Sequence, residues 1–94
     1  MKNKIIEWAN ERQLISANNA PKQALKLSEE VGELARAILK DNKEEQIDAI
    51  GDIQVVLIIL SEQLGVNYNE ALESAYNEIK NRSGQTINGV FIKE

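Results

Sequence analysis

The sequence has no cysteine and no histidine among its 94 residues, and only one proline. The lack of cysteine excludes a disulfide framework and a thiolate metal site. The lack of histidine excludes a catalytic triad built on imidazole, a histidine general base and a zinc site with nitrogen ligands. Acid–base or metal chemistry in this chain therefore has to use oxygen atoms.

Basic residues and long apolar runs are also scarce. The chain has 15 acidic against 11 basic residues and a net charge of −4, which argues against a surface made for nucleic acid. The longest apolar run, Val55 to Leu60, covers six residues and is too short for a membrane span. The N-terminus lacks the apolar stretch of a signal peptide, so we expect a cytoplasmic protein with no nucleic-acid or membrane partner.

Helical periodicity dominates the sequence, and we expect one all-α domain over residues 1–94. Helices are predicted at about residues 2–14, 21–39, 44–64 and 68–82, followed by an extended C-terminal tail. Pro21 fits the first turn of the second helix, Gly65 a C-terminal cap of the third, and Asn67 an N-cap of the fourth. The third helix is apolar on nearly all sides after Ile53, so it should be the most buried one.

Acidic residues recur on the second and third helices at spacings that place them on one face of each helix. Glu30 and Glu33 are three residues apart, and Asp48 and Asp52 are four apart. If the two helices form an antiparallel hairpin around Asp41, Glu33 comes level with Asp48, and Glu30 with Asp52. The four carboxylates then converge and need a cation, because like charges disfavour each other's ionisation. Ligands that are all oxygen favour Mg²⁺, with Mn²⁺ as a substitute.

Two simpler interpretations of these acidic residues stay open. Acidic side chains at spacings of three and four are common on solvated helix faces, which explains Glu30 and Glu33 without any metal. Asp48 and Asp52 fit this explanation less well, because they lead into a strongly apolar helix. Lys26, one turn before Glu30, can also neutralise a carboxylate without a metal ion.

The two acidic clusters together resemble those of the MazG-like family of all-α nucleotide pyrophosphohydrolases, in particular its small phage and prophage members. That family carries an E-E-x-x-E cluster on one helix and an E-x-x-D cluster on the next. Here the first cluster reads Glu29-Glu30-Val31-Gly32-Glu33, and the second ends at Asp52. Ala49 stands where the family has a glutamate, and Asp48 is its substitute on the same helix face. The likeness covers roughly residues 8–82.

The resemblance implies hydrolysis of nucleoside triphosphates between the α and β phosphates, which gives a nucleoside monophosphate and pyrophosphate. House-cleaning of non-canonical nucleotides is one such role. It implies Mg²⁺ held by Glu30, Glu33, Asp48 and Asp52, with water oriented or deprotonated by Glu29 or Glu33. It also points to a homo-oligomer, a dimer or a tetramer, which the shortness of the chain and its apolar third helix favour as well.

The candidate substrate-binding residues are Trp8, Lys26, Asn77, Lys80 and Arg82. Lys80 and Arg82, with the Asn77 amide, resemble the family segment that faces the nucleotide phosphates and would hold the pyrophosphate leaving group. A basic helix C-terminus is equally explained by the helix dipole. Trp8 either stacks on the base or belongs to the core.

Three alternative functions stay open at this point. A dUTP or dCTP pyrophosphatase would share the four-helix plan. A non-catalytic helical interaction module would use the third helix as an oligomer core. A nucleotide-binding protein that turns over slowly is suggested by Ala49, which removes one expected carboxylate.

Overall fold

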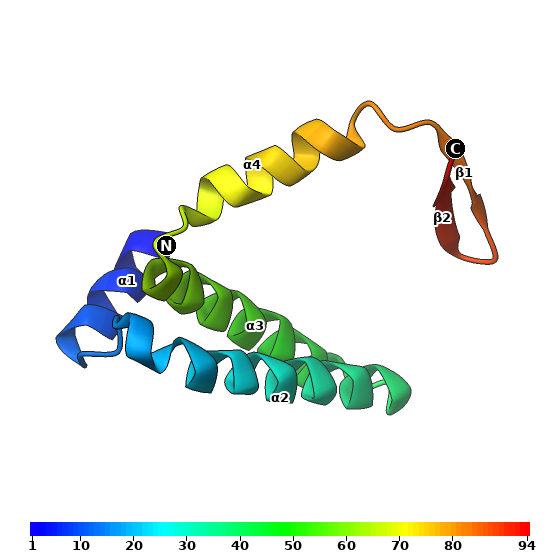
Figure 1. Cartoon of the computed structure of the whole chain (residues 1–94). Coiled ribbons are helices and arrows are strands. Elements are labelled where there is room, and N and C mark those ends of the chain that lie inside the picture. The colour runs from blue at the N-terminus through cyan, green and yellow to red at the C-terminus, as the bar shows by residue number, and fades with distance from the viewer.

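A computed structural model describes all residues, 1–94, as four α-helices followed by a β-hairpin (Figure 1). The helices are α1 (Lys2–Glu11), α2 (Ala20–Leu39), α3 (Lys43–Leu64) and α4 (Tyr68–Ile79). A short 3₁₀ turn, η1 (Ala17–Asn19), leads into α2, and the hairpin consists of β1 (Gly84–Ile87) and β2 (Val90–Lys93). The predicted four-helix, all-α plan is confirmed.

Two helices end earlier than predicted. α1 ends at Glu11 rather than at residue 14, because Gln13 adopts a left-handed φ of 57° that a right-handed helix cannot contain. α4 ends at Ile79 rather than at residue 82, with Lys80 as its C-cap. Arg82 therefore lies beyond the helix, in the turn that leads to the hairpin.

The core lies where α2 and α3 pack side by side as an antiparallel hairpin (Figure 1). Gln46 Nε2 donates a hydrogen bond to the Ala37 carbonyl oxygen at 3.3 Å, which ties the two helices together near their connection. The Asn42 side chain caps α3 by accepting from the Glu45 backbone N–H at 3.0 Å. As predicted, α3 is the most buried helix, with five of the eight buried residues: Ala49, Val56, Ile58, Ile59 and Gln63.

Helix α1 packs against α3 near the far end of the α2–α3 hairpin. Ala9 is fully buried there. The Leu14 carbonyl oxygen accepts two side-chain hydrogen bonds, from Gln63 Nε2 at 2.9 Å and from Asn19 Nδ2 at 3.3 Å. These bonds fix the segment after α1 to α3 and to the start of α2.

Helix α4 leaves this three-helix body at an angle of 105° to α3 and has no buried residue (Figure 1). A hollow of about 300 Å³ lies at the elbow between the two helices. Beyond α4, both strands of the hairpin are exposed, and Asn88 and Gly89 form its two-residue turn with φ values of 51° and 80°. The C-terminal tail is thus extended, as predicted, and its two strands pair with each other.

The chain has an open shape. Its radius of gyration is 15.9 Å, whereas a compact domain of this length has about 12 Å. It exposes 7266 Å², against about 5,400 Å² for a compact monomer of 10.5 kDa. No single helix has the length and apolar character needed to cross a membrane, although the bent pair of α3 and α4 passes on length and composition taken together.

We expect the Gln63→Ala substitution to lower the free energy of unfolding by about 1–3 kcal/mol, because it removes a buried hydrogen bond between α3 and the segment after α1. Gln54→Ala is the matched control, since Gln54 is exposed on the same helix and donates only to Ile50 within that helix. Its effect should stay below about 0.5 kcal/mol. Urea denaturation measures both values, and equal losses would show that Gln63 does not hold α1 in place.

Candidate functional site

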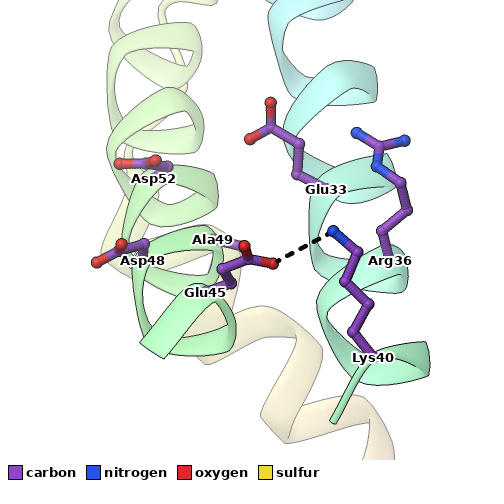
Figure 2. A pocket seen from close by; sticks show the side chains of 7 residues that line it. All are labelled: Glu33, Arg36, Lys40, Glu45, Asp48, Ala49 and Asp52. Carbon is purple, nitrogen blue, oxygen red and sulfur yellow. Dashed lines mark ion pairs between the residues drawn. The ribbon is translucent and has the colours of Figure 1, made fainter. Parts of the chain in front are cut away.

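An open cleft of about 400 Å³ lies between α2 and α3, towards the end where the two helices connect (Figure 2). Seven residues line it: Glu33 and Arg36 from α2, Lys40 from the C-cap of α2, and Glu45, Asp48, Ala49 and Asp52 from α3. All except Ala49 are charged, so the cleft is suited to a charged ligand. The structure brings three of the predicted metal ligands to this one cleft, namely Glu33, Asp48 and Asp52.

Helical spacing explains why these side chains share the cleft. Glu33, Arg36 and Lys40 follow one another at steps of three and four residues, so they occupy one face of α2. Asp48 and Asp52 do the same on α3. The Glu33 carboxylate reaches towards α3, whereas the carboxylates of Asp48 and Asp52 extend away from α2 (Figure 2).

Glu30 does not line the cleft, although it is the most buried of the predicted ligands. Its side chain is 6% exposed, and its Oε1 lies 3.3 Å from Lys26 Nζ. The hydrogen bond from Lys26 to Glu30 and the negative charge of Glu30 raise the pKa of Lys26. Lys26 therefore neutralises a carboxylate, as the spacing predicts, while Glu30 Oε2 stays buried without a partner.

The donor chemistry suits a hard divalent cation, because the acidic groups in the cleft offer only oxygen ligands. The unpartnered, buried Oε2 of Glu30 is the kind of atom that a cation satisfies. However, no three acidic side chains of the chain lie close enough together to hold one ion. To gather around one ion, Glu33, Asp48 and Asp52 would have to adopt new rotamers.

Besides Glu30 and its partner Lys26, two other predicted residues of α1 and α2 lie outside the cleft. Glu29 is exposed on α2 and is not part of the lining. Trp8, on α1, is 46% exposed and is therefore not a core residue. The Arg12 guanidinium covers its ring, 4.3 Å from the ring centroid. Within one chain, Trp8 is not in a position to stack on a base held in the cleft.

The three predicted phosphate-binding residues of the C-terminal part are also separate from the cleft. Asn77, Lys80 and Arg82 lie on α4 or directly after it, and α4 points away from the body (Figure 1). Arg82 pairs with Glu78 at 3.9 Å, and the Lys80 ammonium lies 6.0 Å from the centroid of the Tyr76 ring. The structure does not bring them to the carboxylates of the same chain.

The sequence reasoning missed three lining residues: Arg36, Lys40 and Glu45. Lys40 Nζ and Glu45 Oε2 lie 4.0 Å apart across the cleft (Figure 2). The signal was present, because Arg36 follows Glu33 by three residues and Glu45 precedes Asp48 by three. A search for carboxylates around Ala49 and Asp52 misses the cations on the facing helix. It also misses the E-x-x-D spacing of Glu45 and Asp48, which lies one turn earlier.

Residues 3–82 match the sequence profile of the family described as phosphoribosyl-ATP pyrophosphohydrolase. A protein of Haemophilus phage HP1 (strain HP1c1), described as an uncharacterized 18.2 kDa protein in the rep-hol intergenic region, is 41% identical over 59 residues. The aligned region covers 63% of this chain and 36% of the phage protein, so the chain spans about a third of its relative's length. No solved structure matches the chain.

The raised pKa of Lys26 predicts a loss of stability at high pH. Folding favours the charged ammonium, so its contribution is present below the ordinary pKa of 10.5 and is lost as the pH rises through the higher folded-state value. Between about pH 9 and pH 12, the unfolding free energy of Lys26→Gln should therefore fall less steeply than that of the wild type.

Chemical denaturation at several pH values, followed by circular dichroism, measures this difference. Lys22→Gln is the control, because Lys22 is exposed one turn earlier on α2 and forms no ion pair. The Lys22 variant should keep the wild-type slope. Identical slopes for the Lys26 variant and the wild type would contradict a pairing of Lys26 with Glu30 in solution.

Proposed function

The chain belongs to the phosphoribosyl-ATP pyrophosphohydrolase family, and on this premise we propose that it is a Mg²⁺-dependent hydrolase of nucleoside triphosphates. It cleaves them between the α and β phosphates and releases a nucleoside monophosphate and pyrophosphate. Members of this family are pyrophosphohydrolases, so the class of bond is given by membership. The nucleoside triphosphate substrate, the metal, the MazG-like subgroup and a cytoplasmic location are parts of the proposal.

The observation that carries the proposal is the position of Glu33, Asp48 and Asp52 on the two walls of one cleft. Three carboxylates that line one cleft repel a triphosphate unless a divalent cation binds with it. With a cation present, the same carboxylates become the anchor that attaches the phosphates to the protein. A charged cleft of this composition therefore fits a metal-bridged phosphate ligand better than it fits an apolar or a purely anionic one.

The acidic residues would bind the metal ion and activate the attacking water. Glu33, Asp48 and Asp52, with the free oxygen of Glu30, would hold Mg²⁺, which supplies positive charge at the phosphate oxygens and lowers the pKa of a bound water. The Glu33 carboxylate reaches towards α3, where it can accept a proton from water in the cleft (Figure 2). Glu29, four residues earlier, is the second candidate for this role.

A second candidate substrate is phosphoribosyl-ATP, because the matched family is described by its hydrolysis. It carries a triphosphate as well, so the cleft chemistry is the same and only the base and ribose contacts differ. The third possibility is a non-catalytic or slow nucleotide-binding module. The distance between the acidic side chains favours this module, because no three of them lie close enough together to hold a metal ion.

We expect the wild-type protein to release pyrophosphate in the presence of Mg²⁺ from at least one substrate in a panel. The panel contains canonical and modified nucleoside triphosphates, dUTP, dCTP and phosphoribosyl-ATP. Glu33→Gln and Asp52→Asn should lower the rate by about a hundredfold or more, because each removes a cleft carboxylate. Glu73→Gln, on the exposed surface of α4, is the control and should keep the wild-type rate.

Two results would count against this proposal in different ways. If the wild type releases no pyrophosphate from any substrate, the protein is not such an enzyme and the binding-module alternative gains support. If it does so but Glu33→Gln and Asp52→Asn match the wild type, the activity stands and the cleft is not its site.

We also propose that a second copy of the chain covers the apolar surface that one chain leaves exposed. The surface exceeds that of a compact monomer by roughly 1,800 Å², whereas a standard interface buries about 800 Å² per partner. Leu72, Tyr76 and Ile79 form one stripe along α4, at steps of four and three residues, and each is more than half exposed. In such a dimer or tetramer, Lys80 and Arg82, which follow α4, can approach a neighbour's cleft.

Light scattering at micromolar concentration should therefore give a mass of two or four chains of 10.5 kDa. Leu72→Asp should shift the mass towards one chain, because it places a charge in the apolar stripe. Glu73→Gln, the adjacent polar position, should leave the mass unchanged. A monomeric wild type would contradict the proposed assembly without affecting the cleft.

A further inference from the structure

The charges of the cleft are not evenly mixed. Its two cations come from one side, Arg36 from α2 and Lys40 from the C-cap of that helix (Figure 2). On the opposite wall the charged residues are all acidic. The cleft therefore has a basic edge beside the carboxylates that the proposed metal would use.

Arg36 has no partner within the protein. It takes part in none of the four ion pairs of the chain, and its guanidinium forms no hydrogen bond to another residue. It lies back along α2 over Gly32, where an added methyl group would be 3.6 Å from Nη1. A guanidinium that lines a cleft with all its donors free is available to bind an anion.

The other residues of the cleft leave Arg36 in this state. Ala49, the only uncharged lining residue, is 4% exposed and offers no charge from the wall of α3. Lys40, one turn further along α2, has only an exposed pairing with Glu45 at 4.0 Å. Such an exposed pair contributes little free energy, so an incoming anion can replace Glu45 as the partner of Lys40.

We propose that Arg36, assisted by Lys40, forms an anion subsite that binds the β and γ phosphates of the substrate, the part that leaves as pyrophosphate. This inference rests on the proposed function and specifies which end of the substrate lies where. The terminal phosphates then lie on the α2 side of the cleft, at Arg36 and Lys40, and the reacting α-phosphate lies towards the carboxylates of Glu33 and Asp52.

Chemistry favours a diphosphate-sized group over a single carboxylate or phosphate. The planar guanidinium matches two phosphate oxygens at once, and the Lys40 ammonium adds a second cation four residues away on the same face. Two cations a helical turn apart suit a ligand with two linked anionic groups.

The test measures binding rather than turnover. Isothermal titration in buffer with Mg²⁺ determines the affinity of the full chain for inorganic pyrophosphate and, separately, for a nucleoside monophosphate. We expect the wild type to bind pyrophosphate and Arg36→Gln to bind it about tenfold or more weakly, because a charge-assisted bidentate contact is lost. Lys40→Gln should have a smaller effect, and Arg36→Lys an intermediate one, because it keeps the charge without the planar fork.

Two controls separate a local subsite from a general effect of charge. Lys22→Gln removes one positive charge from an exposed position of α2 outside the cleft and should leave pyrophosphate affinity unchanged. The affinity of Arg36→Gln for the nucleoside monophosphate should also stay at the wild-type value. Circular dichroism spectra that match the wild type show that each variant is folded.

Equal pyrophosphate affinities for the wild type and Arg36→Gln would overturn the inference, and so would a wild type that does not bind pyrophosphate. An equal loss for Arg36→Gln and Lys22→Gln would also overturn it, because the effect would then be one of net charge. The outcome is separable from that of the proposed function. If the protein binds pyrophosphate through Arg36 but hydrolyses no substrate, the subsite is supported and the proposed enzyme activity is refuted. If it hydrolyses a substrate but Arg36→Gln keeps the wild-type affinity for pyrophosphate, the activity is supported and the subsite is refuted.

Discussion

The antiparallel contact between α2 and α3 forms the core of the helical body and the two walls of the cleft. Its surface is made by small and aliphatic residues, and Ala37 and Ala49 are almost completely buried. Small side chains let two helices approach closely, and the long charged residues on the neighbouring faces then meet across a narrow space. The cleft is therefore a by-product of close packing. If the two helices moved apart, the charged residues of the two walls would no longer face one another across the cleft.

Much of this arrangement could be predicted, because it depends on spacing along two long helices. The steps between Glu30, Glu33, Asp48 and Asp52, together with a short connection, are enough to place three of the four in one cleft. The buried character of α3 also follows from its sequence, since an all-round apolar helix has to be covered. The side on which Glu30 lies does not follow, because its place depends on Lys26 and on how the helices are rotated against each other.

The features that sequence reasoning missed have physical reasons too. Arg36 and Lys40 were not singled out from the sequence, because most cations on a helix surface are simply exposed to solvent. They become lining residues of the cleft only because α3 packs opposite them. The apolar stripe of α4 does not predict the direction of that helix, because no residue of α4 is buried against the same chain. For the C-terminal tail, the turn at Asn88 and Gly89 was the available signal for a hairpin, because both residues readily adopt the positive φ that such a turn requires.

The connection between α3 and α4 has a mechanical consequence. It is only three residues long, Gly65 to Asn67, and the first of these is a glycine at a φ of 70°. The twelve residues of α4 extend about 18 Å from this point, so a rotation of about 10° there moves the far end of α4 by about 3 Å. The connection is thus a hinge point, and small changes in its backbone angles produce large displacements of α4 and the hairpin. The backbone angles of three residues, more than any contact further along, set where the end of the chain can reach.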